Sequence, residues 1–120
     1  MSMSTPEEFF SGNPLGAEIY HRVFSFLDDL DDVEVRVTKS QIAFRRRRGF
    51  AYLWDPSRYL DTDVRVVLSL ALDRQDDSAR FKEVVHPSTR VWMHHLEVGS
   101  IDEIDEEAME WLREAYEAGG

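Results

Sequence analysis

The spacing of apolar residues changes twice along this 120-residue chain, and that change constrains the fold more than any other feature. Near each end, apolar residues recur every three or four positions, which is the period of a helix with one buried side. Between about residues 33 and 98 they alternate with polar residues or form short apolar runs, as β-strands do. We therefore expect the order α, β, β, β, β, β, β, α, without an internal repeat.

The first helical segment carries clear start signals. Thr5-Pro6-Glu7-Glu8 has the pattern of a capping box and predicts a short turn that Gly12 ends. Asn13-Pro14 starts a longer helix, whose end is rich in aspartates that oppose the helix dipole, so we expect it to fray. The apolar stripe of this helix is Leu15, Ile19, Val23, Phe26, Leu27 and Leu30.

The last helix has two candidate starts. Ser100-Ile101-Asp102-Glu103 is a second capping-box pattern, and the helix could restart at Asp105. Gly119 is placed to end it. Its apolar stripe would be Ile104, Ala108, Trp111, Leu112 and Ala115.

Six strands are predicted between the helices. Alternation marks the first two, and the nearly continuous apolar tract 64–72 predicts a central strand covered on both faces. The predicted strands are residues 33–37, 42–45, 50–54, 64–72, 81–86 and 91–98.

These elements predict a single α+β domain over residues 1–120, in which residues 1–12 form an N-terminal arm with the short helical turn. We expect a largely antiparallel sheet of about five to six strands. Both terminal helices should pack on one face, because each has a single apolar stripe to bury. The other face would then stay open unless a ligand or a partner covers it. The large aromatic residues expected to fill the core are Phe24, Phe26, Phe44, Trp92, Trp111 and Tyr116.

Several classes of function are excluded or disfavoured by composition. The chain has no cysteine, so it offers neither a thiolate nucleophile nor a thiolate metal site. Its first ten residues show no basic leader with an apolar stretch, and no run approaches the roughly 18 apolar residues of a membrane span. We expect a cytoplasmic protein without a membrane partner.

Four consecutive arginines, Arg45 to Arg48, stand out in a chain of net charge -10. Residues 36–90 hold 12 of the 14 Lys and Arg residues and seven acids, a net of +5, whereas the flanks carry a net of -15. Such a run at a hairpin tip can be an anion site, a self-association contact, a solvated tip, or a partner for the chain's own acidic helices. Nucleic acid stays open as a partner, although the acidic flanks would repel long DNA.

The register of this hairpin decides which side chains meet. With Arg48-Gly49 as a two-residue turn, one sheet face would interleave guanidinium and aromatic groups, able to hold phosphates or stack on bases. That face would carry Arg45, Arg47, Phe50, Tyr52 and Trp54, and the core face Ile42, Phe44, Ala51 and Leu53. A turn of three or four residues could change the register.

Catalytic and metal motifs are weak. Adjacent His94 and His95 would point to opposite faces of a strand, so we expect one in the core beside Trp92 and one exposed, with no metal site. Thr38-Lys39-Ser40 lacks the glycines and the following helix of a phosphate-binding loop, and no serine lies in a nucleophile elbow. We predict no catalytic residue and no cofactor, and an enzyme is the minority hypothesis.

Four tracts of the chain together resemble those of a known family. The main one is Val37-Thr38-Lys39-Ser40-Gln41-Ile42-Ala43-Phe44-Arg45-Arg46-Arg47-Arg48-Gly49-Phe50-Ala51. Later ones are Arg80-Phe81-Lys82-Glu83-Val84-Val85, Trp92-Met93-His94-His95-Leu96 and Trp111-Leu112-Arg113-Glu114-Ala115-Tyr116. In these tracts the chain resembles a bacterial domain-of-unknown-function family, number 5655. The resemblance covers about residues 9–118 and implies a small α+β domain. The family's members are sometimes fused to nuclease-like or transport-associated regions, and the family implies no catalytic motif.

The sequence therefore predicts a non-catalytic binding or interaction module with a basic-aromatic sheet face for an anionic ligand. The candidate ligand-binding residues are Lys39, Arg45, Arg47, Tyr52, Trp54, Arg80, Lys82 and His95. The main alternative is a weak homodimer that buries the apolar part of the same face, namely Tyr52, Trp54, Val67 and Met93. A salt titration distinguishes the two hypotheses, because apolar association survives high salt whereas phosphate contacts weaken steeply.

Overall fold

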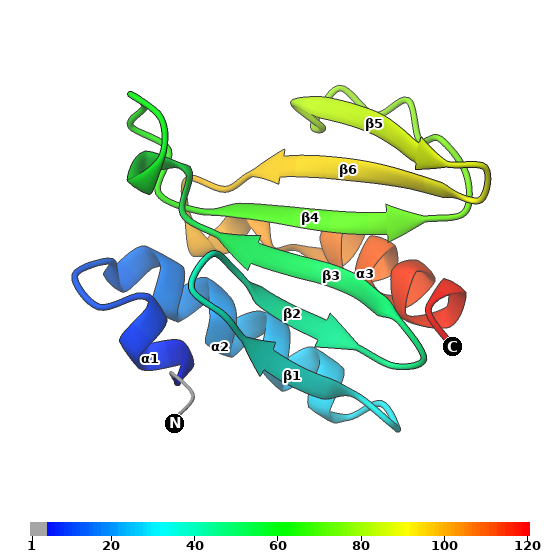
Figure 1. Ribbon diagram of the computed structural model, residues 1–120, viewed down its shortest axis with the longest axis horizontal. Helices are drawn as coiled ribbons and strands as arrows, with labels where there is room; N and C mark the ends of the chain where they lie inside the picture. Colours follow the sequence, from blue (N-terminus) through cyan, green and yellow to red (C-terminus); the bar gives the residue numbers. More distant parts are fainter. Residues whose placement is uncertain (1–4) are drawn as a thin grey trace.

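The fold is described from a computed structural model for residues 5–120, so residues 1–4 of the predicted N-terminal arm lie outside the described residues. Six strands form one antiparallel sheet in the order β1-β2-β3-β4-β6-β5 (Figure 1). The strands are β1 Glu34–Val37, β2 Ile42–Arg45, β3 Gly49–Trp54, β4 Val67–Leu72, β5 Glu83–Ser88 and β6 Val91–Glu97. β3 and β4 are the two middle strands, which confirms a central strand within residues 64–72, although β4 begins three residues later than predicted.

The helices lie on one side of this sheet, as predicted. They are α1 Pro6–Phe9, α2 Pro14–Asp28 and α3 Glu106–Ala118, with single 3-10 turns η1 Pro56–Arg58 and η2 Ile101–Glu103. In Figure 1 both α2 and α3 lie behind the sheet, so the face toward the viewer is free of them. We call this second face the open face. None of the helices within residues 5–120 combines the length and the apolar character that crossing a bilayer requires.

The helix starts follow the side chains that cap them. Thr5 and Glu8 form the predicted capping box, with the Glu8 amide donating to Thr5 Oγ1 over 3.1 Å. Asn13 Oδ1 accepts from the Gly16 amide at 3.0 Å and caps α2. The later of the two predicted starts of the last helix is the real one, because Asp105 accepts from the Ala108 amide at 3.0 Å. Ser100 makes no such bond and opens only η2.

The core lies between the sheet and the two long helices. Side chains that are fully buried there include Ile19, Leu27, Phe44, Leu53, Leu68, Leu70 and Leu112. Trp111 is also buried, its ring 4.4 Å from that of Phe81. The prediction was wrong in degree for Phe24, Phe26, Tyr116 and Trp92, which are only partly buried. Trp92 lies near the start of β6 and stacks on His86 with the ring centroids 3.9 Å apart, beside the core rather than in it.

The β2–β3 hairpin has a three-residue turn, Arg46 to Arg48, and a bulge that the two-residue prediction missed. Arg45 pairs with Gly49 and Phe44 with Ala51, which leaves Phe50 without a partner. The extra residue turns the Phe50 side chain to the helix side, where it is fully buried with its ring 5.8 Å from that of Tyr116. The predicted place of Phe50 on the basic-aromatic face is therefore wrong, whereas Tyr52 and Trp54 do lie on the open face.

Candidate functional site on the open face

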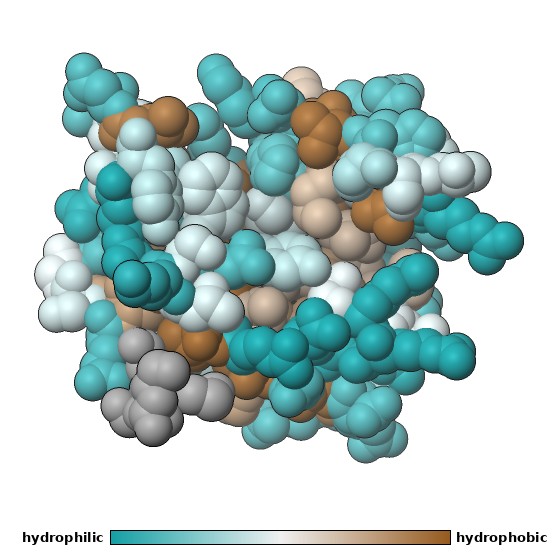
Figure 2. Space-filling model, viewed as in Figure 1, coloured by the Kyte–Doolittle hydropathy of each residue, from teal (hydrophilic) through white to brown (hydrophobic). Residues whose placement is uncertain are grey.

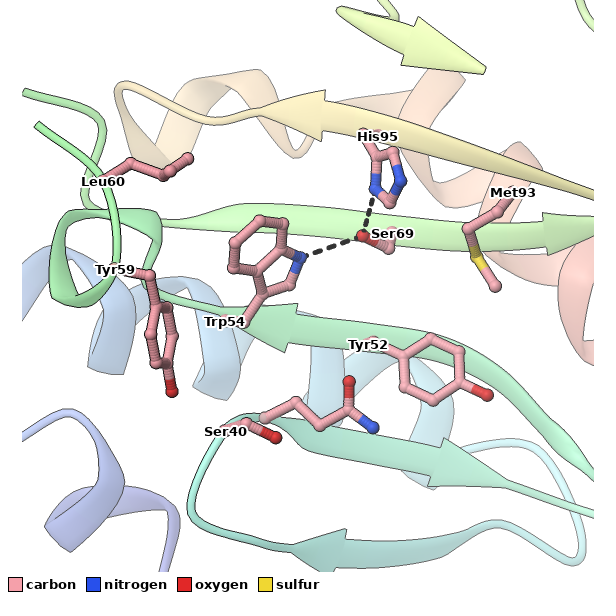
Figure 3. Close-up of a pocket in the computed structure, with 9 residues that line it drawn as sticks. Ser40, Tyr52, Trp54, Tyr59, Leu60, Ser69, Met93 and His95 are labelled. Atoms are coloured by element: carbon pink, nitrogen blue, oxygen red, sulfur yellow. Dashed lines mark hydrogen bonds between the residues drawn. The ribbon is translucent and has the colours of Figure 1, made fainter. Parts of the chain in front are cut away.

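A cavity of about 550 Å³ opens on the open face (Figure 3). The strand register places its floor residues side by side, because Tyr52 pairs with Ser69 and Ser69 pairs with His95. Trp54 lies two residues after Tyr52 on β3, and Met93 lies two residues before His95 on β6. Both therefore share the same face. The remaining walls come from loops and carry Ser40, Gln41, Tyr59 and Leu60. We call this the open-face cavity.

Three of the floor residues form a hydrogen-bond chain, visible as dashed lines in Figure 3. Trp54 Nε1 donates to Ser69 Oγ over 3.0 Å, and Ser69 Oγ lies 2.7 Å from His95 Nδ1. Because the serine oxygen accepts the indole proton, its own hydrogen is available to donate to Nδ1. In the tautomer that matches this direction, the neutral imidazole carries its proton on Nε2, which makes no hydrogen bond to any residue of the described chain 5–120.

The environment of His95 favours this neutral form. Burial lowers the pKa of the His95 imidazole below its ordinary value, and the neighbouring Glu83 only partly offsets the effect. Protonation would also turn Nδ1 into a donor, and the Ser69 hydroxyl would then have to turn its own hydrogen away from the ring. The surroundings of His95 thus favour its neutral imidazole. His95 is half-buried, so the prediction that one of the two histidines is exposed was wrong in degree.

Its neighbour His94 has the predicted place in the core. It is fully buried, with Nδ1 2.9 Å from the Trp92 carbonyl and Nε2 accepting from the Asp76 amide at 2.9 Å. The two histidines face opposite sides of the sheet. Within residues 5–120, no cluster of three or more histidine or acidic side chains is arranged to hold a metal ion.

A buried polar network fixes the segment that forms one wall of the cavity. Asn13 Nδ2 donates to Asp55 Oδ2 at 3.0 Å and to the Arg65 carbonyl at 2.8 Å, which ties both ends of the β3–β4 connection to the start of α2. Arg65 adds an ion pair with Asp55 at 3.6 Å. Between these ends, Tyr59 and Leu60 are 56% and 62% exposed, unusually high for such side chains in this protein. This network therefore fixes both ends of the segment that carries Tyr59 and Leu60 at the mouth of the cavity.

The arginine run divides into two pairs with different surroundings. Arg46 lies 4.0 Å above the Tyr116 ring and donates from Nη1 to the Tyr116 carbonyl at 2.9 Å, while Arg48 donates to the Ala118 carbonyl at 2.8 Å. These contacts place positive charge at the C-terminal end of α3, where the helix dipole favours it. Part of the run is thus a partner of the chain's own acidic helix, one of the alternatives left open by the sequence.

The other two arginines have no such contacts. Arg45 lies on the open face opposite Gly49, and Arg47 is exposed in the turn, where its backbone amide donates to the Gly119 carbonyl. Within residues 5–120 neither side chain makes an ion pair or a hydrogen bond to another residue. Figure 2 shows strongly hydrophilic side chains projecting over this end of the sheet, beside the paler middle of the open face.

The structure brings together some of the predicted site residues and separates others. Tyr52, Trp54 and His95 line the open-face cavity, and Lys82 lines an adjoining hollow with Trp54 and His95. Lys39 is exposed in the loop beside Ser40 and lines neither.

Arg80 does not belong to this group. It lies on the helix side, where its Nη1 contacts Asp105 at 3.0 Å and Glu107 at 2.8 Å. The prediction that Arg80 belongs to the basic-aromatic face was therefore wrong, because those carboxylates hold it at the start of α3.

Ser69, Tyr59, Leu60 and Gln41 were missed as site residues. A serine inside the apolar run of β4 was the available signal for Ser69, since a buried hydroxyl needs hydrogen-bond partners. The side chains from the two loops had no comparable signal, because their approach depends on the Asn13 and Asp55 network.

The lining of the open-face cavity is largely apolar. Aromatic and aliphatic side chains form most of its wall, and no carboxylate from residues 5–120 lines it. Ser69 and His95 resemble a nucleophile and base in their contact, but Ser69 is only 3% exposed and its oxygen is already held by Trp54. A serine nucleophile must instead present its oxygen to the substrate.

The fold and the cavity define a class of protein: a small antiparallel α+β domain with helices on one face of the sheet and a ligand-sized cavity on the other. The sequence profile of DUF5655, a domain of unknown function, matches residues 7–119. The chain therefore belongs to this family, as its motifs indicated. Searches of curated proteins and of solved structures find no significant match.

Proposed function

We propose that this protein is a non-catalytic binding domain that takes one small organic molecule in the open-face cavity. The ligand has a flat, largely apolar body and a hydrogen-bond acceptor that meets Nε2 of His95. The observation that carries this proposal is the chain from Trp54 through Ser69 to His95 at the cavity floor.

The volume and the walls support a small ligand. A cavity of about 550 Å³ is in the range of roughly 300–1,000 Å³ that ligand sites occupy. The aromatic rings of Tyr52, Trp54 and Tyr59 offer faces for stacking, and Met93 offers an adaptable thioether. These groups match a planar molecule better than a sugar or a long polar chain.

The hydrogen-bond chain supports recognition rather than packing alone. Its bonds hold the indole and the imidazole in fixed orientations, so little ordering is left for the moment of binding. The His95 imidazole contacts Ser69 through Nδ1 and keeps Nε2 as a free donor. It would therefore select ligands that carry a hydrogen-bond acceptor. Ligands without one would leave the His95 donor desolvated and unpaired, at a cost of about 1–3 kcal/mol.

A screen of flat aromatic fragments by saturation-transfer difference NMR tests the proposal. We expect binders among fragments with a ring acceptor, such as quinoline, and weaker binding of naphthalene, which lacks it. Trp54→Ala and His95→Ala should each weaken quinoline binding at least fivefold. The matched controls are Trp92→Ala and His86→Ala, which remove the same residue types outside the cavity.

Absence of any binder, or equal effects of the cavity and control variants, would overturn the proposal.

A homodimer is the second candidate, favoured by the exposure of Tyr59 and Leu60 at the rim. Sedimentation at micromolar concentration addresses it. A dimer that persists at high salt and dissociates on Leu60→Ser would assign the open face to self-association instead.

A further inference from the structure

A second hollow of about 240 Å³ lies at the end of the sheet where β3 begins and β4 ends. Two turns from different parts of the chain contribute an arginine each: Arg48 from the β2–β3 turn and Arg90 from the β5–β6 turn. Among the described residues 5–120, no acidic side chain lines it. We call this the basic hollow.

The basic hollow adjoins the open-face cavity. Tyr52 and Met93 line both, so the two spaces meet over these side chains. The Tyr52 ring extends over Gly49, where any side chain would collide with its hydroxyl group. Because Gly49 has no side chain, the Tyr52 ring fits over it. This ring lies between the aromatic part of the surface and its basic end.

The arginines of the hollow differ from those that pair with acids, a property that they share with Arg45 and Arg47. Arg36, Arg65, Arg74 and Arg80 all form ion pairs with carboxylates. Within residues 5–120, neither Arg48 nor Arg90 does. Arg48 is also oriented, because one of its nitrogens donates to the Ala118 carbonyl at 2.8 Å while its other donors remain available.

We propose that the ligand of the open-face cavity is an elongated organic acid. This inference rests on the proposed function and adds the ligand's charge and length. The flat body lies over Trp54 and His95, and the oxyanion, a carboxylate or a phosphate, is held by Arg48 and Arg90. Two guanidinium groups with free donors suit such an anion, because they can bind its oxygens in pairs.

The strand geometry sets the length. Arg90 precedes His95 by five residues, which is about 16 Å along an extended strand at roughly 3.3 Å per residue. Arginine side chains reach back over part of that distance. The acid group should therefore be separated from the flat body by a linker of several bonds rather than attached to the ring.

The test uses four probes: 6-(quinolin-6-yl)hexanoate, its methyl ester, 6-(quinolin-6-yl)hexyl phosphate and quinoline-6-carboxylate. Calorimetry on the whole chain measures each affinity. We expect the long acid or the long phosphate to bind at least tenfold more tightly than the ester, and quinoline-6-carboxylate to show no such advantage. The better of the two long anions identifies the oxyanion.

Variants assign the contact. Arg48→Gln with Arg90→Gln should abolish the preference for the anion over the ester, and Arg90→Gln alone, in an exposed turn, should reduce it. Arg47→Gln is the matched variant in the same hairpin and lines neither space, so it should retain the preference. Loss of the preference in Arg47→Gln but not in the Arg48 and Arg90 variants would overturn the assignment.

The outcomes separate this inference from the proposed function. Equal binding of acid and ester, with both weakened by Trp54→Ala, would refute the acidic ligand and leave the binding domain intact. Binding of none of the four probes, together with a negative fragment screen, would refute both. A short acid that binds as well as the long one would refute the proposed length.

Discussion

The docking of the arginine hairpin on α3 predicts a large difference between two adjacent arginines. Arg46→Ala removes a hydrogen bond of 2.9 Å to the Tyr116 carbonyl and a cation–π contact of 4.0 Å with the Tyr116 ring. Arg47→Ala removes an exposed side chain that has no such contacts. The two variants change the net charge equally, so their difference reports the contacts.

The magnitude follows from these contacts. A hydrogen bond from a charged donor contributes roughly 1.5–3 kcal/mol, a cation–π contact about 0.5–2 kcal/mol, and a cation near a helix C-terminus about 0.3–1 kcal/mol. Against them, Arg46 Nε is buried without a hydrogen-bond partner, which costs about 1–3 kcal/mol. We expect a net loss of about 1.5–3 kcal/mol for Arg46→Ala and less than about 0.5 kcal/mol for Arg47→Ala.

Urea unfolding measures both losses. At an m-value of about 1–3 kcal/mol/M, the Arg46 variant should unfold at a midpoint lower by roughly 1 M, with the slope unchanged. The Arg47 midpoint should stay close to that of the wild type. Equal midpoints for the two variants would show that the hairpin does not dock on α3, and the reasoning from the bulged register would fail with it.

Three further predictions concern the core, α2 and the cavity floor. Trp111→Ala should cost about 3–5 kcal/mol in denaturant unfolding, and a loss below about 1 kcal/mol would show that this ring is not buried. Gly16→Ala should lower the melting temperature, although alanine favours helices, because the added methyl group would collide with the Phe10 ring; a rise would contradict that packing. The wild type should lose more stability than His95→Gln between pH 7.5 and 5. Because burial lowers the folded-state pKa of His95, its contribution is complete above about 6.5 and is lost as pH falls through the folded-state pKa; parallel pH profiles would refute it.

The order and type of the elements could be predicted because they depend on local patterns. Residues two apart in a strand share a face, so Ile42 with Phe44 and Ala51 with Leu53 could be assigned to the core before any fold was known. The single apolar stripe of each long helix required a shared sheet face. Tyr52, Trp54 and His95 line one cavity, because strand parity alone places them on the same face of the sheet.

The tertiary structure decided the contacts between segments far apart in the chain. One extra residue in the β2–β3 hairpin moved Phe50 to the opposite face, and no propensity of the residues before it reports such a bulge. Arg80 faces carboxylates 25 and 27 residues further along the chain, and Arg46 meets a carbonyl 70 residues away. The chain from Trp54 through Ser69 to His95 likewise joins three strands. The alternation of apolar and polar residues along a strand predicts which face of the sheet a side chain takes. The pairing of strands and the docking of helices determine which partner it meets there.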